Sequence, residues 1–597
     1  MAQVSGTKEQ RVWQLLHQTV AAYQQQDLPT ALRCCDQLMQ LDNSRADAWS
    51  LRGVLLVNAG RLAEAESAYL RAIELQPGFV DAWFNLGNLY LRQKLYDRAL
   101  ERYQHCLVLD PRYASAYEQM GQLYVDVNQP GKALQFLQQA VSLRPDSASL
   151  YNNLGKLFWE GGNSEQGASL FRRAVQLAPQ HAGFHDNLLI ILHFLPSQTA
   201  ETLLTEHRLW AERHIKALIP AQFSHANDPN PDRLLRIGYL SSTFIVRDAA
   251  GASLFPLLTS HDRSRYQVYC YATLPREDDL TATLKGCCHW RQVDGLTDQA
   301  LFELIQRDGI DILIDANGHT MANKLSVLAR RAAPVQVTWL GYEGTTGLSS
   351  IDYIVSDWNL SPMGSDGTYT EQVMRMPYGY ACYAPATDAP DVSVRLPALI
   401  NGYVTFASFN KLSKLNRSVA VLWSEILKRV PESRLLLKWK LAEDEMAQNY
   451  IGQLFADAGI GRDRLIFRGQ SPYNEMMQQY NEVDIALDPF PFSGGATTCD
   501  ALWMGVPVVT LLGQRHASNH TVSHLRSVGL PELIATTPQH YIDTVVALAS
   551  DLDRQQRLRT ALRPLMQASP LCNGRLFALH FERLLRDMWG NWCRHHS

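Results

Sequence analysis

The sequence predicts a helical repeat array followed by two α/β lobes, and three observations support this fold class. Four kinds of residue recur every 34 positions in the first third of the chain. Short apolar runs alternate with helical segments from residue 235 onward. A polar, proline-bearing stretch at 221–233 separates the two patterns. We therefore expect an α domain at 1–220, a linker at 221–233, and α/β lobes at 234–400 and 401–597.

The repeats have the composition of stacked helical hairpins. An aromatic and a small residue join two helices, and a proline ends the second one. This is the tetratricopeptide pattern, with four clear units between residues 46 and 179, a degenerate unit before them and capping helices up to about residue 220. The recurring residues are Pro77, Pro111, Pro145 and Pro179; Gly53, Gly87, Gly121 and Gly155; Trp49, Trp83, Tyr117 and Tyr151; and Ala65, Ala99, Ala133 and Gly167.

Side-chain amides follow the same register, at Asn85, Gln119, Asn153 and Asn187. The first helix of each hairpin lines the concave groove, so these amides are expected to form a ladder that hydrogen-bonds an extended acceptor peptide. A solvated polar face that binds nothing is the alternative. Leu51 interrupts the ladder at its N-terminal end.

Composition limits the class of protein. The 597 residues carry a net charge of −4, which gives no electrostatic footprint for nucleic acid. No apolar run reaches transmembrane length, and the first residues lack a secretory core. The ten cysteines contain no C-x-x-C pair, and the adjacent pairs Cys34-Cys35 and Cys287-Cys288 are poorly placed for bridging. We expect reduced thiols and a cytoplasmic protein.

The first lobe is predicted to be a doubly wound parallel sheet, with strands at 235–240, 266–272, 310–315, 335–340 and 353–356 and a helix at 296–307. Ligands of such sheets lie beyond the carboxyl ends of the strands. Asp315 and His319 occur there and are our first candidates for catalysis. The alternative is that His319 only braces neighbouring backbone. Arg247 and Asp248 lie in the loop after the first strand and can pair with each other.

The second lobe has strands at 404–407, 435–438, 465–467, 483–487 and 506–512. The small-residue turn before the helix that follows residue 495 predicts an anion site, because unpaired N–H groups and the positive end of the helix dipole face outward. Lys414 follows a strand end and is placed to meet phosphates, and Asp500 lies one turn into the helix, where it can accept from a ribose. An ordinary αβ crossover with a solvated lysine remains the alternative.

Metal-ligand clusters are missing from the sequence. There is no H-E-x-x-H, and the D-x-D match at 551–553 falls in a helical, surface-like segment. An amphipathic helix at about 574–592 is expected to pack against a lobe.

Seven motifs together resemble the O-GlcNAc transferase and SPINDLY family of protein O-glycosyltransferases, in its bacterial type, over essentially the whole chain. They are I-G-Y-L-S-S at 237–242, N-G-H-T at 317–320, A-P-V-Q-V-T-W-L-G-Y at 333–342, G-T-T-G at 344–347, F-N at 409–410 with Lys414, G-G-A-T-T at 494–498, and S-P-L-C-N at 569–573.

The resemblance implies a GT-B fold of two Rossmann-like lobes, with a nucleotide sugar held mainly by the second and no metal cofactor. It implies that Lys414 binds the donor diphosphate, with Asn410, Gly494, Gly495, Thr497 and Thr498 around it, and that Asp500 binds the ribose. Two departures stand out. Arg247-Asp248 replaces a histidine of many relatives, and Met476 stands where the O-GlcNAc enzymes place a histidine near the base.

The leading hypothesis is therefore an inverting, metal-independent enzyme that moves a sugar from a nucleotide sugar to Ser or Thr hydroxyls of proteins held by the repeat groove. UDP-GlcNAc is the favoured donor. A SPINDLY-like O-fucosyltransferase using GDP-fucose, an inactive peptide-binding scaffold, and an enzyme that extends glycans on a lipid or surface polymer are the alternatives. Acceptor proteins are the expected partners, without nucleic acid or a membrane span, and self-association into a homo-oligomer stays open.

Overall fold

The computed structural model describes residues 8–245, 249–278, 281–386 and 388–596 of the chain. The protein divides into two compact units, Met1–Leu157 and Phe158–Ser597. The boundary falls inside helix α9 (Ala148–Glu160), far ahead of the linker that the sequence predicts at 221–233. The last helical hairpins therefore belong to the unit that contains the sheets.

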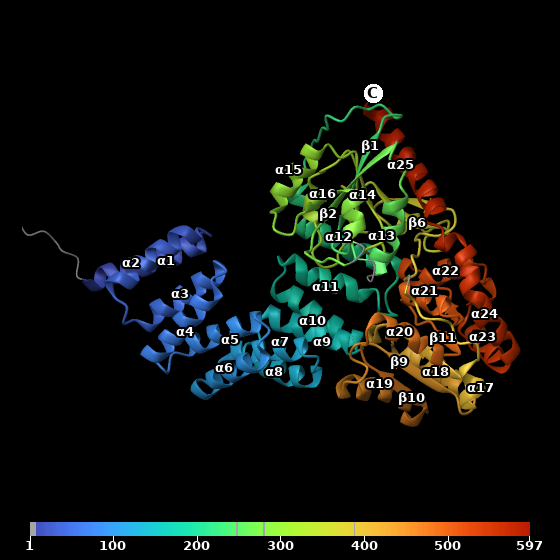
Figure 1. Ribbon diagram of the computed structural model, residues 1–597, viewed down its shortest axis with the longest axis horizontal. Helices are drawn as coiled ribbons and strands as arrows, with labels where there is room; N and C mark the ends of the chain where they lie inside the picture. Colours follow the sequence, from blue (N-terminus) through green and yellow to red (C-terminus); the bar gives the residue numbers. More distant parts are fainter. Residues whose placement is uncertain (1–7, 246–248, 279–280, 387, 597) are drawn as a thin grey trace, which may run out of the picture. The chain divides into compact units, whose positions relative to one another are not determined.

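The first unit consists of antiparallel helical hairpins, coloured blue in Figure 1. Each second helix ends two residues before its repeat proline or the equivalent Asn43, as predicted. The helices are α1 (Lys8–Gln24), α2 (Leu28–Leu41), α3 (Ala46–Asn58), α4 (Leu62–Leu75), α5 (Val80–Arg92), α6 (Tyr96–Leu109), α7 (Ala114–Asp126) and α8 (Pro130–Leu143).

The repeat glycines allow the two helices of a hairpin to approach closely. A Cβ on Gly53 would lie 2.4 Å from the ring of Tyr69, and one on Gly87 would lie 2.6 Å from the ring of Tyr103. The aromatic series has a second role, since the Trp83 indole donates to the carbonyl of Pro77 over 2.9 Å. The repeats around Gly53 and Gly87 are thus held by a close helix contact, and Trp49 and Trp83 bind the loops that precede their helices.

Three further helices open the second unit, namely α10 (Ser164–Leu177), α11 (Ala182–Leu192) and α12 (Ala200–His214). They contact both lobes. Ser164 donates to the carbonyl of Ser413 in the second lobe over 2.8 Å, and Leu189 and Trp210 pack into the core of the first lobe. These contacts explain why the compact unit begins at residue 158 and not at the linker.

The first lobe is a seven-stranded sheet with strand order β3-β2-β1-β4-β5-β6-β7, and all neighbouring strands are parallel. The strands are nearly continuous buried runs of Ile, Val, Leu and Tyr, as expected for a parallel sheet whose two faces are both covered by other elements. The strands are β1 (Leu235–Ser241), β2 (Tyr266–Ala272), β3 (His289–Gln292), β4 (Ile312–Asp315), β5 (Val335–Thr338), β6 (Tyr353–Asp357) and β7 (Gln372–Met376). Its helices are α13 (Ala249–Ser260), α14 (Thr281–Cys287), α15 (Asp298–Asp308) and α16 (Leu325–Ala329).

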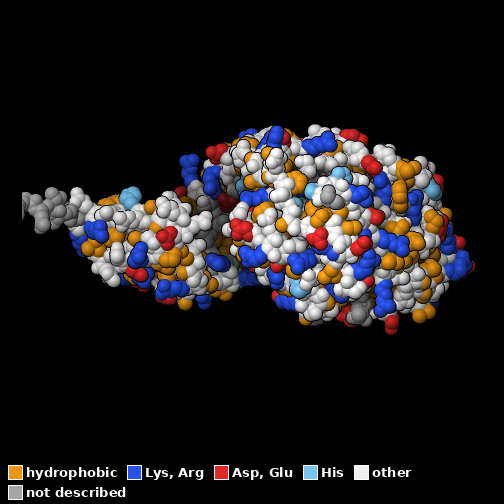
Figure 2. All heavy atoms as spheres, turned by 90° about the horizontal axis from the view of Figure 1, so that it is seen from above, with side chains coloured by type: hydrophobic (Ala, Val, Ile, Leu, Met, Phe, Trp, Pro, Cys, Tyr) orange, Lys and Arg blue, Asp and Glu red, His pale blue; other side chains and the backbone are white. Residues whose placement is uncertain are grey.

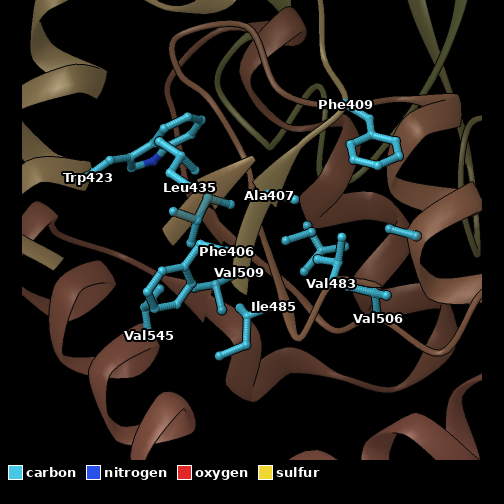
Figure 3. Close-up of a cluster of buried hydrophobic side chains, with 14 of the residues drawn as sticks. Phe406, Ala407, Phe409, Trp423, Leu435, Val483, Ile485, Val506, Val509 and Val545 are labelled. Carbon is cyan, nitrogen blue, oxygen red and sulfur yellow. The ribbon is translucent and has the colours of Figure 1, made fainter. Parts of the chain in front are cut away.

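The second lobe repeats this topology with six strands in the order β10-β9-β8-β11-β12-β13. Figure 3 shows its core, where Phe406, Leu435 and Ile485 come from three of these strands and Trp423 from a covering helix. The strands are β8 (Thr405–Ser408), β9 (Arg434–Lys438), β10 (Leu465–Arg468), β11 (Ile485–Leu487), β12 (Val508–Leu511) and β13 (Ile534–Ala535). The helices are α17 (Pro397–Asn401), α18 (Arg417–Arg429), α19 (Glu445–Asp457), α20 (Tyr473–Gln479), α21 (Ala496–Trp503), α22 (His520–Val528), α23 (Pro538–Ser550) and α24 (Leu552–Ala568).

The last helix, α25 (Gly574–His596), returns to the first lobe (Figure 1). It contacts α13, β5 and β7, and Phe581, Leu585 and Trp589 are fully buried in the first-lobe core. The sequence predicts this amphipathic helix and its packing against a lobe. α25 completes the core of the first lobe, although the second lobe directly precedes it in the sequence.

The remaining differences from the sequence prediction concern short elements. The edge strands β3, β7 and β13 were not expected, because they have few residues and mixed polarity. Asp551 caps α24 by accepting from Arg554 N–H, so the D-x-D match has a structural role. Within the described residues, no helix is long and apolar enough to cross a membrane. Figure 2 shows acidic and basic side chains interspersed on the visible face of the second unit.

Candidate active site

A cavity of about 540 Å³ opens between the two sheets of the second unit. The first lobe lines it with Ala250, Ser253, Leu340 and Glu343, and the second lobe lines it with residues that follow its strand ends. Those from the second lobe include Asn410, Lys411, Lys414, Trp439, Tyr473, Met476, Phe492, Gly495, Ala496, Thr497, Asp500, His520 and His524. The volume suits a ligand of nucleotide size.

Lys414 brings a buried cation to this cavity. It closes the 3-10 turn Leu412–Lys414 after β8, and only 8% of its surface is exposed. Its Nζ donates to the Ser493 carbonyl over 2.6 Å and to Asn410 Oδ1 over 3.1 Å. Burial lowers the pKa of Lys414 to about 8, against the raising effect of the Asp488 carboxylate. The ammonium is therefore mostly charged at pH 7, and its two hydrogen-bond acceptors are uncharged.

The predicted anion turn lies beside this lysine, between β11 and α21. Gly494 N–H is taken by Asp488 Oδ1 over 2.6 Å, and a Cβ on Gly494 would lie 2.5 Å from Thr498 Oγ1. A Cβ on Gly495 would meet nothing within 4 Å, so this glycine faces open space. The first N–H groups of α21 point outward as at any helix N-terminus. The turn thus presents backbone N–H groups to the cavity, and the hydrogen bond from Gly494 N–H to Asp488 fixes its position on the lobe.

The two threonines of the turn differ in their contacts. Thr497 lines the cavity and donates through Oγ1 to Asn410 Oδ1 over 3.1 Å. Thr498 is buried, and its hydroxyl lies 2.8 Å from that of Thr521 on α22. Thr497 can therefore meet a ligand, whereas Thr498 joins α21 to α22.

Asp500 is the carboxylate of the second lobe that faces the cavity. Tyr383 and Tyr473 both donate to its Oδ1, over 2.7 and 2.9 Å. This arrangement leaves Oδ2 for a ligand hydroxyl. Burial raises the pKa of Asp500 to about 6, and the two phenol hydroxyls act in the opposite direction. The two tyrosines were not foreseen, because Tyr383 is distant along the chain and carries no motif.

A second ionisable pair spans the lobes and was also missed. Glu343, in the loop after β5, contacts His520 at the start of α22, and both line the cavity. The His520 imidazole holds the pKa of Glu343 near 2 despite burial of the carboxylate. Phe194, which follows α11, stacks on Phe492 with ring centroids 4.7 Å apart. The helical segment therefore forms part of the cavity wall.

The two predicted catalytic residues of the first lobe lie outside the cavity lining. His319 is 1% exposed, and its two ring nitrogens contact Asp186 Oδ1 at 2.9 Å and the Thr346 carbonyl at 2.8 Å. Asp315 accepts from the N–H groups of Asn317 and Gly318, and burial raises its pKa to about 6. These contacts favour the bracing alternative, and a catalytic role for either residue stays a prediction.

The amide ladder occupies equivalent places on successive first helices. Asn85, Gln119 and Asn153 are half-buried on α5, α7 and α9, and Asn187 is half-buried on α11. Asn85 already donates to Ser50 Oγ over 3.3 Å. Peptide binding by these side chains stays a prediction.

Two other expectations from the sequence also remain untested. Arg247 and Asp248 lie outside the described residues. The described part of the chain contains no group of three or more His, Cys, Asp or Glu side chains arranged to hold a metal ion.

Comparison with known proteins agrees with this geometry. The model of glycosyl transferase family 41 matches residues 187–384 and 392–581, which include the cavity lining. A tetratricopeptide repeat model matches residues 20–78, 51–114 and 119–182. Both halves of the predicted architecture are therefore confirmed.

Among curated proteins, the chain is 37% identical over 412 residues to a Solanum lycopersicum protein described as "Probable UDP-N-acetylglucosamine--peptide N-acetylglucosaminyltransferase SPINDLY", covering 68% of this chain and 44% of that protein. The Arabidopsis thaliana protein of the same description is 38% identical over 413 residues, or 68% and 45% of the two chains. The chain thus spans less than half the length of these plant relatives.

A solved structure extends the likeness to the fold. A point mutant of the Thermobaculum terrenum O-GlcNAc transferase superposes with a TM-score of 0.81 at 34% identity, covering 87% of this chain and 98% of that one. The repeat helices, the paired parallel sheets and the family match agree with one another. The chain belongs to glycosyl transferase family 41, as a tetratricopeptide-repeat protein with a GT-B body.

Proposed function

We propose that the protein is an O-glycosyltransferase that moves a sugar from a nucleotide sugar to Ser or Thr hydroxyls of acceptor proteins. The observation that carries the proposal is the Lys414 ammonium, which is buried at the cavity wall beside the open N-terminus of α21. A buried cation and unpaired N–H groups around one space are complementary to a diphosphate.

The leaving group of such a transfer is a nucleoside diphosphate, which gains negative charge as the bond to the sugar breaks. Lys414 is held toward the cavity by Ser493 and Asn410, so its position needs no rearrangement during the reaction. Preorganised charge of this kind lowers the barrier because it stabilises the developing anion. Lys414 and the α21 dipole would then perform the role of a metal ion, which supports a metal-independent reaction.

Asp500 fits the ribose of the nucleotide. Its Oδ1 is fixed by two phenol hydroxyls, so Oδ2 is oriented to accept from a ribose hydroxyl. The half-buried Trp439 and Met476 line the same cavity, and they offer flat and flexible apolar surface to a base.

The acceptor hydroxyl would attack the anomeric carbon from the side opposite the diphosphate. A single displacement of this kind inverts the anomeric configuration. We favour UDP-GlcNAc as the donor, because the plant relatives are described as UDP-N-acetylglucosamine–peptide transferases and the bacterial structure as an O-GlcNAc transferase. GDP-fucose is the second candidate, since the N-G-H-T motif resembles the SPINDLY branch.

The test is transfer of radiolabelled sugar from UDP-GlcNAc and from GDP-fucose to proteins of the source cell by the full chain. Labelled protein with one donor, lost in Lys414→Met, is the expected result. If no labelled protein is found, calorimetry with UDP and GDP shows whether the chain binds a nucleotide at all. Binding of neither nucleotide would support the scaffold alternative, whereas binding without transfer to protein would point to a glycan acceptor.

A further inference from the structure

Three thiols meet at one edge of the first lobe, away from the cavity lining. Cys270 lies on β2, Cys287 ends α14, and Cys288 follows it. The Cys287 and Cys288 sulfurs are 3.7 Å apart. Cys270 lies on β2, the neighbour of the strand β3 that Cys288 precedes, and all three cysteines belong to the same buried cluster. Sugar transfer has no need of these groups.

A cation completes the surroundings of Cys288. Nη2 of Arg263, from the segment between α13 and β2, lies 3.8 Å from the Cys288 sulfur and also donates to the Leu258 carbonyl of α13. The other nearby cation, Lys285, is taken by Glu277 over 2.6 Å. The sulfur of Cys288 thus lies beside a guanidinium and next to the Cys287 thiol.

The ionisation of the three thiols is unequal. The nearby Cys270 thiol and the Arg263 guanidinium lower the pKa of Cys288 against the effect of burial, whereas burial raises the pKa of Cys270 and that of Cys287. Tyr239 from β1 also faces Cys288, and burial keeps the pKa of its phenol well above the ordinary value. One thiolate flanked by two protonated thiols is the expected state at neutral pH.

Access is unequal as well. Cys288 is half-buried beside the exposed Arg263, while Cys270 is completely buried. A small oxidant can therefore reach Cys288 directly, and Cys270 can react only through it. Adjacent cysteines bridge poorly, because consecutive Cα atoms lie 3.8 Å apart and disulfides span about 4.4–6.8 Å. Cys270 is thus a better partner for an oxidised Cys288 than Cys287 is.

We propose that Cys288 is a peroxide-reactive site whose sulfenic acid is converted by Cys270 into an internal disulfide. In the first step the Cys288 thiolate attacks a peroxide oxygen, the O–O bond breaks, and hydroxide leaves from hydrogen peroxide. The sulfur loses two electrons and the peroxide gains them. In the second step the Cys270 sulfur displaces the hydroxyl of the sulfenic acid, and its proton leaves with that hydroxyl as water.

The experiment measures thiol reactivity on the intact protein by mass spectrometry, with the half-buried Cys34 as internal reference. At pH 7, iodoacetamide should label Cys288 about tenfold faster than Cys34, since the thiolate is the reacting form. Arg263→Gln should remove most of this difference and Arg263→Lys should restore part of it. Equal labelling of Cys34 and Cys288, unchanged in Arg263→Gln, would overturn the thiolate assignment.

Hydrogen peroxide then tests the second step. In the wild-type protein we expect a Cys270–Cys288 disulfide that dithiothreitol reverses, and in Cys270→Ser we expect a Cys288 sulfenic acid trapped by dimedone. Cys287→Ser should leave the disulfide intact. A peroxide-induced disulfide between Cys287 and Cys288, or none that contains Cys288, would refute the pairing. Neither result depends on sugar transfer, so the proposed enzymatic function is tested separately.

Discussion

The two lobes have the same strand order, yet they use their strand ends differently. In the first lobe, Asp315 ends the central strand β4 and His319 follows it, and both make their hydrogen bonds to neighbouring protein groups. In the second lobe, Lys414 follows β8, Asp500 lies on the helix after β11, and both line a cavity. All four side chains are hydrogen-bonded to the protein, so the difference between the lobes is that only Lys414 and Asp500 also line the cavity.

The largest expected effect tests this difference directly. Lys414→Met should lower the rate of sugar transfer about 100- to 1,000-fold, because it removes a preorganised charge from the leaving group. Steady-state kinetics with the functional donor measures the loss. The matched control is Lys411→Met, a neighbouring lysine that also lines the cavity but is exposed. Equal losses in both variants would mean that only general positive charge matters.

Asp500→Asn should weaken binding of the nucleoside diphosphate about tenfold to 100-fold, because hydrogen bonds to a charged group contribute about 1.5–3 kcal/mol. Calorimetry measures the dissociation constant. Asp315→Asn is the counterpart in the first lobe, and it should leave this constant unchanged. Weaker nucleotide binding in Asp315→Asn would show that the first lobe contributes to the donor site.

The pH dependence sharpens the role of Lys414. Its pKa is lowered to about 8, so the free protein loses the ammonium proton as pH rises through that value. Affinity for the nucleotide sugar should therefore fall by up to about tenfold per pH unit above pH 8, and it should also fall below the Asp500 pKa of about 6, where that carboxylate is protonated. Binding to Lys414→Met should lack this decline, and that variant also corrects for titration of the base.

The smallest functional effect is expected at His319. His319→Asn should reduce transfer less than about threefold while lowering the free energy of unfolding by about 1–3 kcal/mol, because a buried hydrogen-bonding group loses its partners. Denaturant unfolding and kinetics are compared on the same preparation. A large loss of turnover with unchanged stability would restore the catalytic prediction for this residue.

Periodicity made the architecture predictable from sequence. The 34-residue spacing reflects a repeated helical hairpin with close helix contacts, as at Gly53 and Tyr69. The buried strands were recognisable because they are continuous apolar runs. The cavity lining was predictable where a local motif marks it, as for Lys414 and the turn at 494–498. Tyr383, Glu343 and Phe194 were missed because separate parts of the fold bring them to the cavity. The contact of His319 with Asp186 could not be predicted, since Asp186 lies on a helix 133 positions earlier.

The return of α25 to the first lobe has a consequence for biosynthesis. A nascent chain emerges from the ribosome with its N-terminal part first, and domains generally begin to fold in that order. The first lobe, however, needs Phe581, Leu585 and Trp589 to close its core. Its exposed apolar surface must therefore wait until α25 has been translated, and a stop codon just before α25 would damage the earlier lobe more than the later one.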